Sequence, residues 1–463
     1  MSNECCIVAV GRYCLEGKGT EPEIQYPEKT PTRVLIPFVG IIQDSRAAND
    51  KYSSMRNSKP MSNHKAQHKT GSTSSAEGEY REEWKKIVPH SMPIYQTSVY
   101  DYPDLESLDD YYNGRIPGAY IYSRNGLPNS SEAGRLVAEF EHADAGLACA
   151  SGMGSLLVAL MSVVGQGEHI VASNELYGGT SVLINKELSR FGIESTFVDA
   201  TSVSAIEDAV KPNTKVILVE SISNPTMKVC DIEATASVAH RAEKATLIVD
   251  NTFATPFVLK PLTLGANLVM HSGTKSLGGH GDITIGFLCG DCKLISRANE
   301  FCSRSGVIAG PFDCWLATRS LATWEIRVKQ ACSNAIKLAS FLESRSDTIS
   351  KVYYPGLRSH PQYFVAKRMF SDGLFGSMLS FTLNDEFEKA SAFVRALKKV
   401  TLTPSLGSYH TSISHPGKTS HRNITEAQKR ESGITDSMIR VSVGIEDYQS
   451  IEEDFGKALD SIR

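Results

Sequence analysis

Residues 246–282 read TLIVDNTFATPFVLKPLTLGANLVMHSGTKSLGGHGD, and this stretch decides the fold. It holds two short apolar strands, residues 246–250 and 267–271, and polar residues follow each of them at once. Similar strands recur along the chain, with helical patterns between them, at 146–150, 169–172, 195–199, 216–220 and 284–289. Short apolar strands separated by amphipathic helices are typical of a mostly parallel sheet covered on both faces. The sequence therefore predicts one large α/β domain.

The rest of the chain divides into two further parts. Residues 1–85 are predicted to be a mobile N-terminal extension, because 44–80 are rich in Ser, Asn, Lys, His and Gly and have little to bury. Residues 86–330 form the large domain, which begins with an N-terminal arm. A long helical stretch at 313–344 leads into residues 331–463, where strands near 378–383 and 438–443 predict a smaller α+β domain.

Composition excludes several classes of function. Lys and Arg number 48 against 52 Asp and Glu, a net charge of −4, so no basic surface for nucleic acid is expected. The longest apolar stretch, residues 156–164, is far shorter than the roughly 20 residues of a membrane span. The cysteines are scattered through apolar runs, which favours free thiols and a cytoplasmic protein. Cys289 and Cys292 form a lone C-x-x-C pair, and no metal site is predicted.

Two strand ends carry residues suited to chemistry. Ligands of such sheets bind beyond the carboxyl ends of the strands. Asp250 ends one apolar strand, and Lys275 follows another, ahead of a glycine-rich loop. A lysine in such a place is costly to bury unless it is paired or used covalently. The glycines follow Thr274 and Lys275 instead of preceding them, so the loop is not a nucleotide P-loop.

Two further junctions complete a set. Residues 150–155 lie between a strand and an apolar helix, whose N-terminus suits an anion. Leu157 stands where a dinucleotide site needs its third glycine, so a single phosphate is favoured. Asn224, held extended before Pro225, is placed to present its amide. An amine, an acid, an amide and a phosphate site are the partners that pyridoxal 5'-phosphate needs.

From about Val88 to its C-terminus, roughly four fifths of its length, the chain resembles the Cys/Met metabolism (trans-sulfuration) family of pyridoxal phosphate enzymes. This family includes cystathionine γ-lyase, cystathionine β-lyase, cystathionine γ-synthase, methionine γ-lyase and O-acylhomoserine sulfhydrylases. The resemblance rests on nine ordered motifs: PIYQTS at 93–98, YSR at 122–124, SGM at 151–153, YGGT at 177–180, SNPT at 223–226, VDNT at 249–252, HSGTK at 271–275, SLG at 405–407 and IRVSVGIED at 439–447.

The resemblance implies fold type I, the aspartate-aminotransferase-like architecture, and assigns roles to residues. Lys275 would hold the cofactor covalently and later move protons between substrate carbons. Asp250 would pair with the pyridine nitrogen, and Asn224 would bond the ring hydroxyl. Tyr177 would stack on the ring and act in catalysis at the leaving group.

For the phosphate, the resemblance implies the backbone groups of Gly152 and Met153 and the hydroxyls of Ser272 and Thr274. These two hydroxyls stand two residues apart, and in an extended segment they would face the same way. No metal is implied.

Other implied contacts reach across subunits or hold the substrate. Tyr122 and Arg124 would contact the phosphate of a neighbouring subunit, since a planar guanidinium suits a dianion. Dimers that share their active sites within a homotetramer are therefore implied. Arg440, with Ser405, would bind the substrate α-carboxylate, and Tyr122 would also line the substrate site.

Four departures from the family pattern bear on the substrate. Ser276 stands where an aromatic residue usually follows the lysine, and residues 127–129 read Leu-Pro-Asn in place of Asn-Pro-Thr. His410 stands where members acting on cystathionine often carry glutamate, which weakens the case for cystathionine. Gly179 replaces a cysteine frequent in bacterial methionine γ-lyases, which weakens the case for methionine.

The sequence thus predicts a carbon–sulfur lyase, similar to cystathionine γ-lyase, that acts on a small sulfur amino acid by γ- or β-elimination. The products would be a 2-oxo acid, ammonia and a thiol. Two alternatives stay open. One is γ-replacement, in which a thiol adds to make cystathionine or homocysteine. The other is a catalytically silent relative that acts as a binding protein through residues 1–85.

Overall fold

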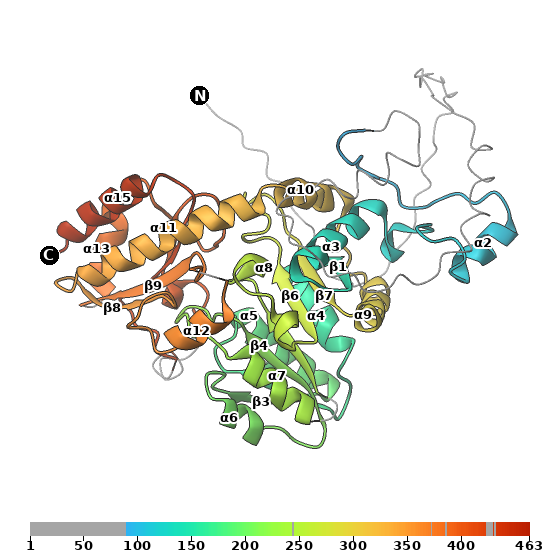
Figure 1. Cartoon of the computed structure of the whole chain (residues 1–463), viewed down its shortest axis with the longest axis horizontal. Helices are drawn as coiled ribbons and strands as arrows, with labels where there is room; N and C mark the ends of the chain where they lie inside the picture. The colour runs from blue at the N-terminus through green and yellow to red at the C-terminus, as the bar shows by residue number, and fades with distance from the viewer. Residues whose placement is uncertain (1–88, 243–244, 372, 385–386, 423–428, 430–431) are drawn as a thin grey trace, which may run out of the picture. The chain divides into compact units, whose positions relative to one another are not determined.

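The computed structural model describes residues 89–463 apart from 243–244, 372, 385–386, 423–428 and 430–431. The predicted extension, residues 1–85, lies outside the described residues. Two sheets organise the described chain, and a helix links the segments that carry them (Figure 1).

The larger sheet has seven strands in the order β1-β7-β6-β5-β4-β2-β3. Their bounds are β1 Ala145–Cys149, β2 His169–Ser173, β3 Glu194–Val198, β4 Thr214–Glu220, β5 Thr246–Asp250, β6 Leu268–Ser272 and β7 Gly286–Gly290. The pairs from β3 to β6 are parallel, and only β7 runs antiparallel to both its neighbours. The prediction of a mostly parallel sheet is confirmed.

Helices bury both faces of this sheet, as the apolar strands require. Alternate residues of one strand enter different cores: Leu247 and Val249 of β5 join one cluster with the first set of helices, and Ile248 joins another with the second set. The first set comprises α3 Pro128–Glu141, α6 Val203–Asp208, α7 Ile232–Arg241, α8 Thr255–Val258 and α10 Pro311–Leu321. The second comprises α4 Gly152–Met161 and α9 Cys292–Ser305. The short α5, Gly178–Val182, follows β2.

The long helix predicted at 313–344 is two helices, α10 and α11 Trp324–Ser344. At the break, the Ser320 carbonyl oxygen accepts hydrogen bonds from the Thr323 N–H and from Arg327 Nη2. A side chain that enters the backbone ladder is a common reason for a helix to end. The predicted domain boundary at 330/331 falls inside α11.

The smaller sheet has five strands in the order β10-β11-β12-β9-β8. Their bounds are β8 Ile349–Tyr353, β9 Met378–Leu383, β10 Thr401–Leu402, β11 Ser412–Ser414 and β12 Met438–Ser442. The helices α12 Tyr363–Met369, α13 Phe387–Ala396 and α15 Tyr448–Asp460 follow along the chain, and α11, α13 and α15 share a core cluster with this sheet. Before α3, the arm carries α2 Leu105–Tyr112, in which no residue is buried.

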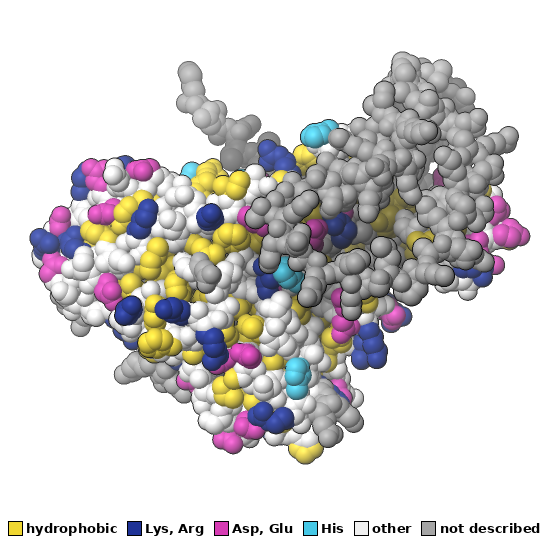
Figure 2. Space-filling model, in the orientation of Figure 1, with side chains coloured by type: hydrophobic (Ala, Val, Ile, Leu, Met, Phe, Trp, Pro, Cys, Tyr) yellow, Lys and Arg dark blue, Asp and Glu magenta, His cyan; other side chains and the backbone are white. Residues whose placement is uncertain are grey.

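Charged side chains of both signs occur on the visible described surface (Figure 2). On the face shown in Figure 2, basic and acidic side chains are interspersed, in keeping with the small net charge. Among the described residues, no helix combines the length and the apolar character that a bilayer crossing needs. The described cysteines are free, including buried Cys289 and exposed Cys292.

Candidate active site

Strands β5 and β6 are parallel neighbours, so Asp250 at the end of β5 and the turn that carries Lys275 after β6 both lie at the carboxyl edge of the sheet. After β6 the chain enters a tight turn. Gly278 N donates to Gly273 O at 2.8 Å, and Gly279 N donates to Lys275 O at 2.7 Å. We call residues 273–279 the lysine turn. The expectation that Ser272 and Thr274 share an extended segment is wrong, because this turn begins directly after Ser272.

Lys275 is half-buried, and its ε-amine has one hydroxyl partner among the described residues. Its Nζ donates to Ser405 Oγ at 3.1 Å. Burial, and then the positive charge of Arg440, lower the pKa of Lys275 from its ordinary value. A lowered pKa keeps more of the amine neutral near physiological pH, and the neutral form is the one that attacks carbonyl carbons.

A loop of the smaller domain packs directly on the lysine turn. Gly407 has a φ of +79°, and a Cβ there would lie 2.5 Å from Ser276 N and 2.8 Å from the carbonyl carbon of Lys275. Gly407 N also donates to Ser442 Oγ at 2.8 Å. Only glycine permits this backbone conformation and this close approach. Ser405 is thereby fixed beside the amine.

Asp250 is held by the residue two positions after it. Its Oδ1 accepts from Thr252 N at 3.0 Å and from Thr252 Oγ1 at 2.5 Å. Burial raises the pKa of Asp250, while the bonds from Thr252 and the nearby His271 oppose that rise. The carboxylate therefore has a fixed orientation, and its charge is sensitive to what lies next to it.

Glu220, which belongs to none of the predicted site residues, lies beside Asp250. The two residues are register partners at the ends of β4 and β5. Glu220 is buried, and burial, followed by the charge of Asp250, raises its pKa well above the ordinary value. Its Oε1 accepts from Tyr177 N at 2.6 Å, and it also accepts from the backbone N–H of Asn224. The sequence could have identified Glu220 as a candidate site residue, because it ends an apolar strand just as Asp250 does.

Arg440 joins the predicted substrate and cofactor residues. From β12, its Nη1 donates to Asn224 Oδ1 at 3.0 Å and its Nη2 donates to Ser405 O at 3.1 Å. Burial lowers the pKa of Arg440 to about 10. Its Nε is buried and has no hydrogen-bond partner among the described residues. A buried donor without an acceptor is costly, and an anionic ligand would satisfy it.

The N-terminus of α4 meets the end of β6, as a phosphate site requires. Ser151 caps the helix by accepting from Gly154 N at 3.0 Å. A Cβ on Gly152 would lie 2.7 Å from Ser272 Cβ, so the two predicted phosphate residues are in contact. The Thr274 hydroxyl, in contrast, already donates to the Ile285 carbonyl at 3.2 Å and accepts from its N–H at 3.1 Å.

Tyr177 and Met153 lie close together around Gly179. A Cβ at Gly179 would be 2.6 Å from the Tyr177 ring and 3.4 Å from Met153 Sδ. The absence of a side chain at 179 therefore leaves room for the tyrosine ring, which is 45% exposed. This gives a physical reason for one departure seen in the sequence.

Tyr122 and Arg124 make different contacts from the other predicted site residues. Arg124 Nη1 donates to the carbonyl of Ser303 on α9, and its guanidinium lies 5.4 Å from the Tyr122 ring centre. In the described part of the chain, neither residue makes a hydrogen bond to another predicted site residue.

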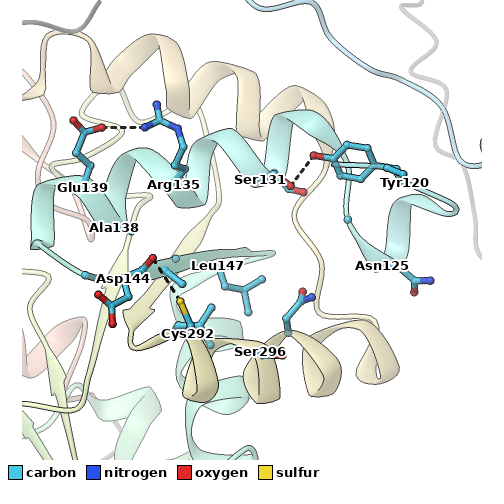
Figure 3. A pocket seen from close by; sticks show the side chains of 18 of the residues that line it. Tyr120, Asn125, Ser131, Arg135, Ala138, Glu139, Asp144, Leu147, Cys292 and Ser296 are labelled. Carbon is cyan, nitrogen blue, oxygen red and sulfur yellow. Dashed lines mark hydrogen bonds and ion pairs between the residues drawn. The ribbon is translucent and has the colours of Figure 1, made fainter. Parts of the chain in front are cut away.

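Two cavities differ in their relation to the site. One, of about 610 Å³, is lined by Thr274, Ser405 and His410 among others, and so adjoins the amine. The other, of about 770 Å³, lies between α3 and α9, where Arg135 bonds Glu139 and Cys292 approaches the Asp144 carbonyl (Figure 3). None of the predicted site residues lines it. The described residues contain no cluster of His, Cys, Asp or Glu suited to a metal ion.

The chain is similar to a family of known enzymes. Residues 72–460 match the model of a family described as Cys/Met metabolism PLP-dependent enzymes. The chain is 38% identical over 374 residues to L-methionine gamma-lyase of Fusobacterium nucleatum, covering 80% of this chain and 94% of that protein. It is 41% identical over 373 residues to cystathionine gamma-lyase of Bacillus subtilis, with coverage of 80% and 94%. The chain belongs to the Cys/Met metabolism family.

Solved structures of similar proteins agree with the predicted fold. Cystathionine gamma-lyase from Lactobacillus plantarum, complexed with L-serine, superposes with a TM-score of 0.74 at 34% identity, covering 80% of this chain and 93% of that one. The predicted aspartate-aminotransferase-like architecture is confirmed. Enzymes of the Cys/Met metabolism family depend on pyridoxal phosphate, which is therefore the cofactor of this chain.

The site fits that cofactor. Lys275 supplies an amine of lowered pKa, and Asp250 supplies an oriented carboxylate. The side-chain nitrogen of Asn224 has no partner among the described residues, so it is free to donate to a ring oxygen. Ser151 caps the N-terminus of α4, where free backbone N–H groups would suit a phosphate.

Proposed function

We propose that the protein is a carbon–sulfur lyase that eliminates the γ- or β-substituent of a sulfur amino acid. The observation that carries this proposal is the Lys275 amine, of lowered pKa, held 3.1 Å from Ser405 Oγ beside the buried Arg440. That arrangement supports a role for Lys275 as a base and for Arg440 as the binding group for an anion. The curated names of two similar proteins, a methionine γ-lyase and a cystathionine γ-lyase, support the same reaction class.

Arg440 would bind the substrate α-carboxylate. Its Nε is a buried donor without a partner in the described chain, and its two Nη groups are already fixed by Asn224 and Ser405. A guanidinium fixed in this way is pre-organised, so little side-chain entropy is lost when a carboxylate binds. The substrate α-carbon would then lie near Lys275, because Ser405 contacts both residues.

Lys275 would take the proton from the substrate α-carbon on Nζ. Because burial and Arg440 lower its pKa, a larger fraction of the amine is neutral and able to act as a base, and once protonated it can return the proton to a neighbouring carbon. The bound cofactor supplies an electron sink for the pair left when the α-carbon–hydrogen bond breaks. Asp250 would keep a proton on the pyridine nitrogen, and Asn224 would donate to the ring hydroxyl.

Tyr177 would stack on the cofactor and assist the departing thiol. Its backbone N–H is tied to Glu220, which fixes the chain here, while its ring reaches the solvent side of the site. Loss of the sulfur substituent would leave a 2-oxo acid and ammonia as the remaining products. We place this reaction in the cytoplasm, since the described cysteines are free thiols.

The product profile tests this proposal. Purified protein is incubated separately with cystathionine, with methionine, and with an O-acylhomoserine plus cysteine, and 2-oxo acid, ammonia and thioether are measured. Elimination predicts oxo acid and ammonia without any added thiol. A thioether that forms only with added thiol, with no oxo acid, would show γ-replacement instead. Bound cofactor with no turnover on any substrate would favour a silent binding protein.

Substitution of Lys275 by alanine tests the role proposed for this lysine. The elimination rate should fall by several orders of magnitude, about the range that nucleophile or base removal costs in other enzymes. The circular dichroism spectrum and the size of the assembly should persist, because Lys275 makes one side-chain hydrogen bond. Near-normal turnover by folded K275A would refute the role given to this lysine.

A further inference from the structure

Arg327 is a buried cation that the proposed reaction does not use. It lies in the first turn of α11, and its guanidinium group extends toward the lysine turn. Nη1 donates to Ser276 O at 2.9 Å, and Nη2 donates to Leu277 O at 3.0 Å and to Ser320 O at 2.9 Å. In the described ranges no carboxylate pairs with it. Its Nε donates to Thr323 Oγ1 at 3.4 Å. A buried arginine bonded only to carbonyl and hydroxyl oxygens is unusual, because most buried charges are paired.

Two of these three carbonyls belong to the peptide units directly after Lys275. The lysine turn is closed like the end of a helix by the bonds from Gly278 N to Gly273 O and from Gly279 N to Lys275 O. Carbonyls at such an end have no partner within the turn. The guanidinium supplies the missing donors, and its positive charge suits the negative end of the aligned peptide dipoles.

Gly279 makes room for this contact. It has a φ of +72°, and a Cβ there would lie 1.7 Å from Arg327 Nη1. Gly281, two residues later, has nearly the same φ of +70°, but a Cβ there would meet nothing within 4 Å. The guanidinium therefore occupies the space that any other residue at 279 would need.

The opposite side of the lysine turn rests on the Ser405 loop. Gly407 contacts the backbone at Lys275 and Ser276, and Tyr409 N donates to Gly279 O at 2.9 Å. The turn is thus held between α11 and this loop. Ser405, the partner of the amine, comes from the same loop.

We infer that Arg327 is a positioning residue for Lys275: its bonds to the Ser276 and Leu277 carbonyls, anchored by a third bond to Ser320 of α10, keep the lysine turn closed and hold the ε-amine against Ser405. The effect of Arg327 on turnover rests on the proposed function, but its contacts with the lysine turn do not. Without the guanidinium, the buried carbonyls of Ser276 and Leu277 would lack this donor, and the turn would rearrange to reach water. Lys275 would then be more hydrated, and its pKa would rise toward the ordinary value.

Reactivity of the amine tests this directly. Full-length protein stripped of cofactor is labelled with acetic anhydride across a pH series, and mass spectrometry follows acetylation of the peptide that contains Lys275. Arg327→Met should move the midpoint of this reactivity to higher pH, and Arg327→Lys should move it less, since an ammonium keeps the charge but not the fork. Arg190→Met, at an exposed arginine, should leave the midpoint unchanged. An unchanged midpoint in folded R327M would overturn the inference.

A glycine pair covers the case in which R327M fails to fold. Gly279→Ala and Gly281→Ala impose the same positive-φ strain in the same loop, but only the first displaces the guanidinium. G279A should therefore shift the Lys275 midpoint upward, and G281A should not. Equal shifts, or no shift in either, would contradict the role of Arg327.

Kinetics of the cofactor-loaded enzyme separate this inference from the proposed function. Because Arg327 has no place in the substrate site, R327M should lower kcat about a hundredfold, the cost of a displacement near 1 Å, with a smaller change in KM. A fall in thermal stability with kcat and KM unchanged would mark a purely structural role and would reject the inference. If the wild type showed no lyase activity while the labelling midpoint still shifted, the proposed function would fail and the positioning role would stand.

Discussion

Glu220 and Asp250 place two carboxylates side by side at the ends of neighbouring strands. Because burial and Asp250 raise the pKa of Glu220, the folded protein holds a proton there that the unfolded chain releases above its ordinary value of 4.5. The folded state then binds more protons than the unfolded state over this range. Stability contributed by Glu220 is therefore present at low pH and is lost as pH rises above about 4.5.

Replacing Glu220 with glutamine tests this sign. The amide of E220Q keeps an oxygen that can accept from Tyr177 N but cannot ionise. We expect the thermal midpoint of E220Q to fall less than that of the wild type between pH 5 and pH 8, as measured by calorimetry. Glu187→Gln, at a surface residue, should follow the wild type. Parallel curves for E220Q and the wild type would mean that Glu220 is not protonated in the fold.

Residues that end apolar strands or open helices can be recognised from the sequence, and residues whose partners lie far along the chain cannot. Lys275, Asp250 and Asn224 all follow strand signals, and their roles at the site stay predictions. Arg327 is 50 residues from its Leu277 partner, and buried Glu141 accepts from His271 Nε2 at 2.6 Å across 130 residues. No periodicity or motif spacing reports such pairs, because tertiary packing alone makes them.

Helix α15 carries a carboxylate that organises a turn of the smaller domain. Asp454 is buried and accepts from the backbone N–H groups of Lys398, Lys399 and Val400 at 3.0, 2.9 and 3.0 Å. Asp454→Ala would leave these donors unsatisfied, at about 1–3 kcal/mol for each one that water cannot reach. We expect a clear fall in the thermal midpoint. Glu453→Ala, whose carboxylate reaches only lysine side chains, should change it little.

The Ser405 loop depends on one glycine. Gly407→Ala would force a Cβ to within 2.5 Å of Ser276 N at a φ of +79°, and the backbone strain alone costs about 1–3 kcal/mol. The loop should move off the lysine turn, so both kcat and the thermal midpoint should fall. Gly306→Ala, at a φ of +74° with open space around it, should lower stability without lowering kcat. Equal losses of kcat in both variants would contradict this account.

Elements with strong periodicity can be predicted well. Strands β5 and β9 coincide with their predicted ranges, because one is a short apolar run and the other alternates apolar and polar residues toward its end, and both patterns are typical of strands. The break between α10 and α11 cannot be predicted in this way, since Ala322 and Thr323 are ordinary residues and the break depends on contacts made at the Ser320 carbonyl. Local sequence carries no record of that contact.

At the scale of the whole molecule, the proposed sharing of active sites between subunits is testable. In such a dimer, Arg124 of one subunit would contribute to the active site that contains Lys275 of the other subunit. Arg124→Ala and Lys275→Ala should each be impaired alone. Co-expressed, they should form mixed dimers with one intact site, giving about one quarter of wild-type activity for random pairing of equal amounts. Activity no greater than the sum of the two variants would reject sharing, and with it the homotetramer built from such dimers.

The antiparallel course of β7 has a further consequence. Ser272 and Gly286 are paired across β6 and β7 in the interior of the larger sheet, so residues 273–285 leave and re-enter at fixed points. An insertion or deletion there would have to be absorbed within residues 273–285, because a slip of the pairing by one residue would turn every following side chain to the opposite face. We therefore expect insertions and deletions among homologues to be rare in residues 273–285, which include Lys275, and more frequent in loops at the periphery of the domain.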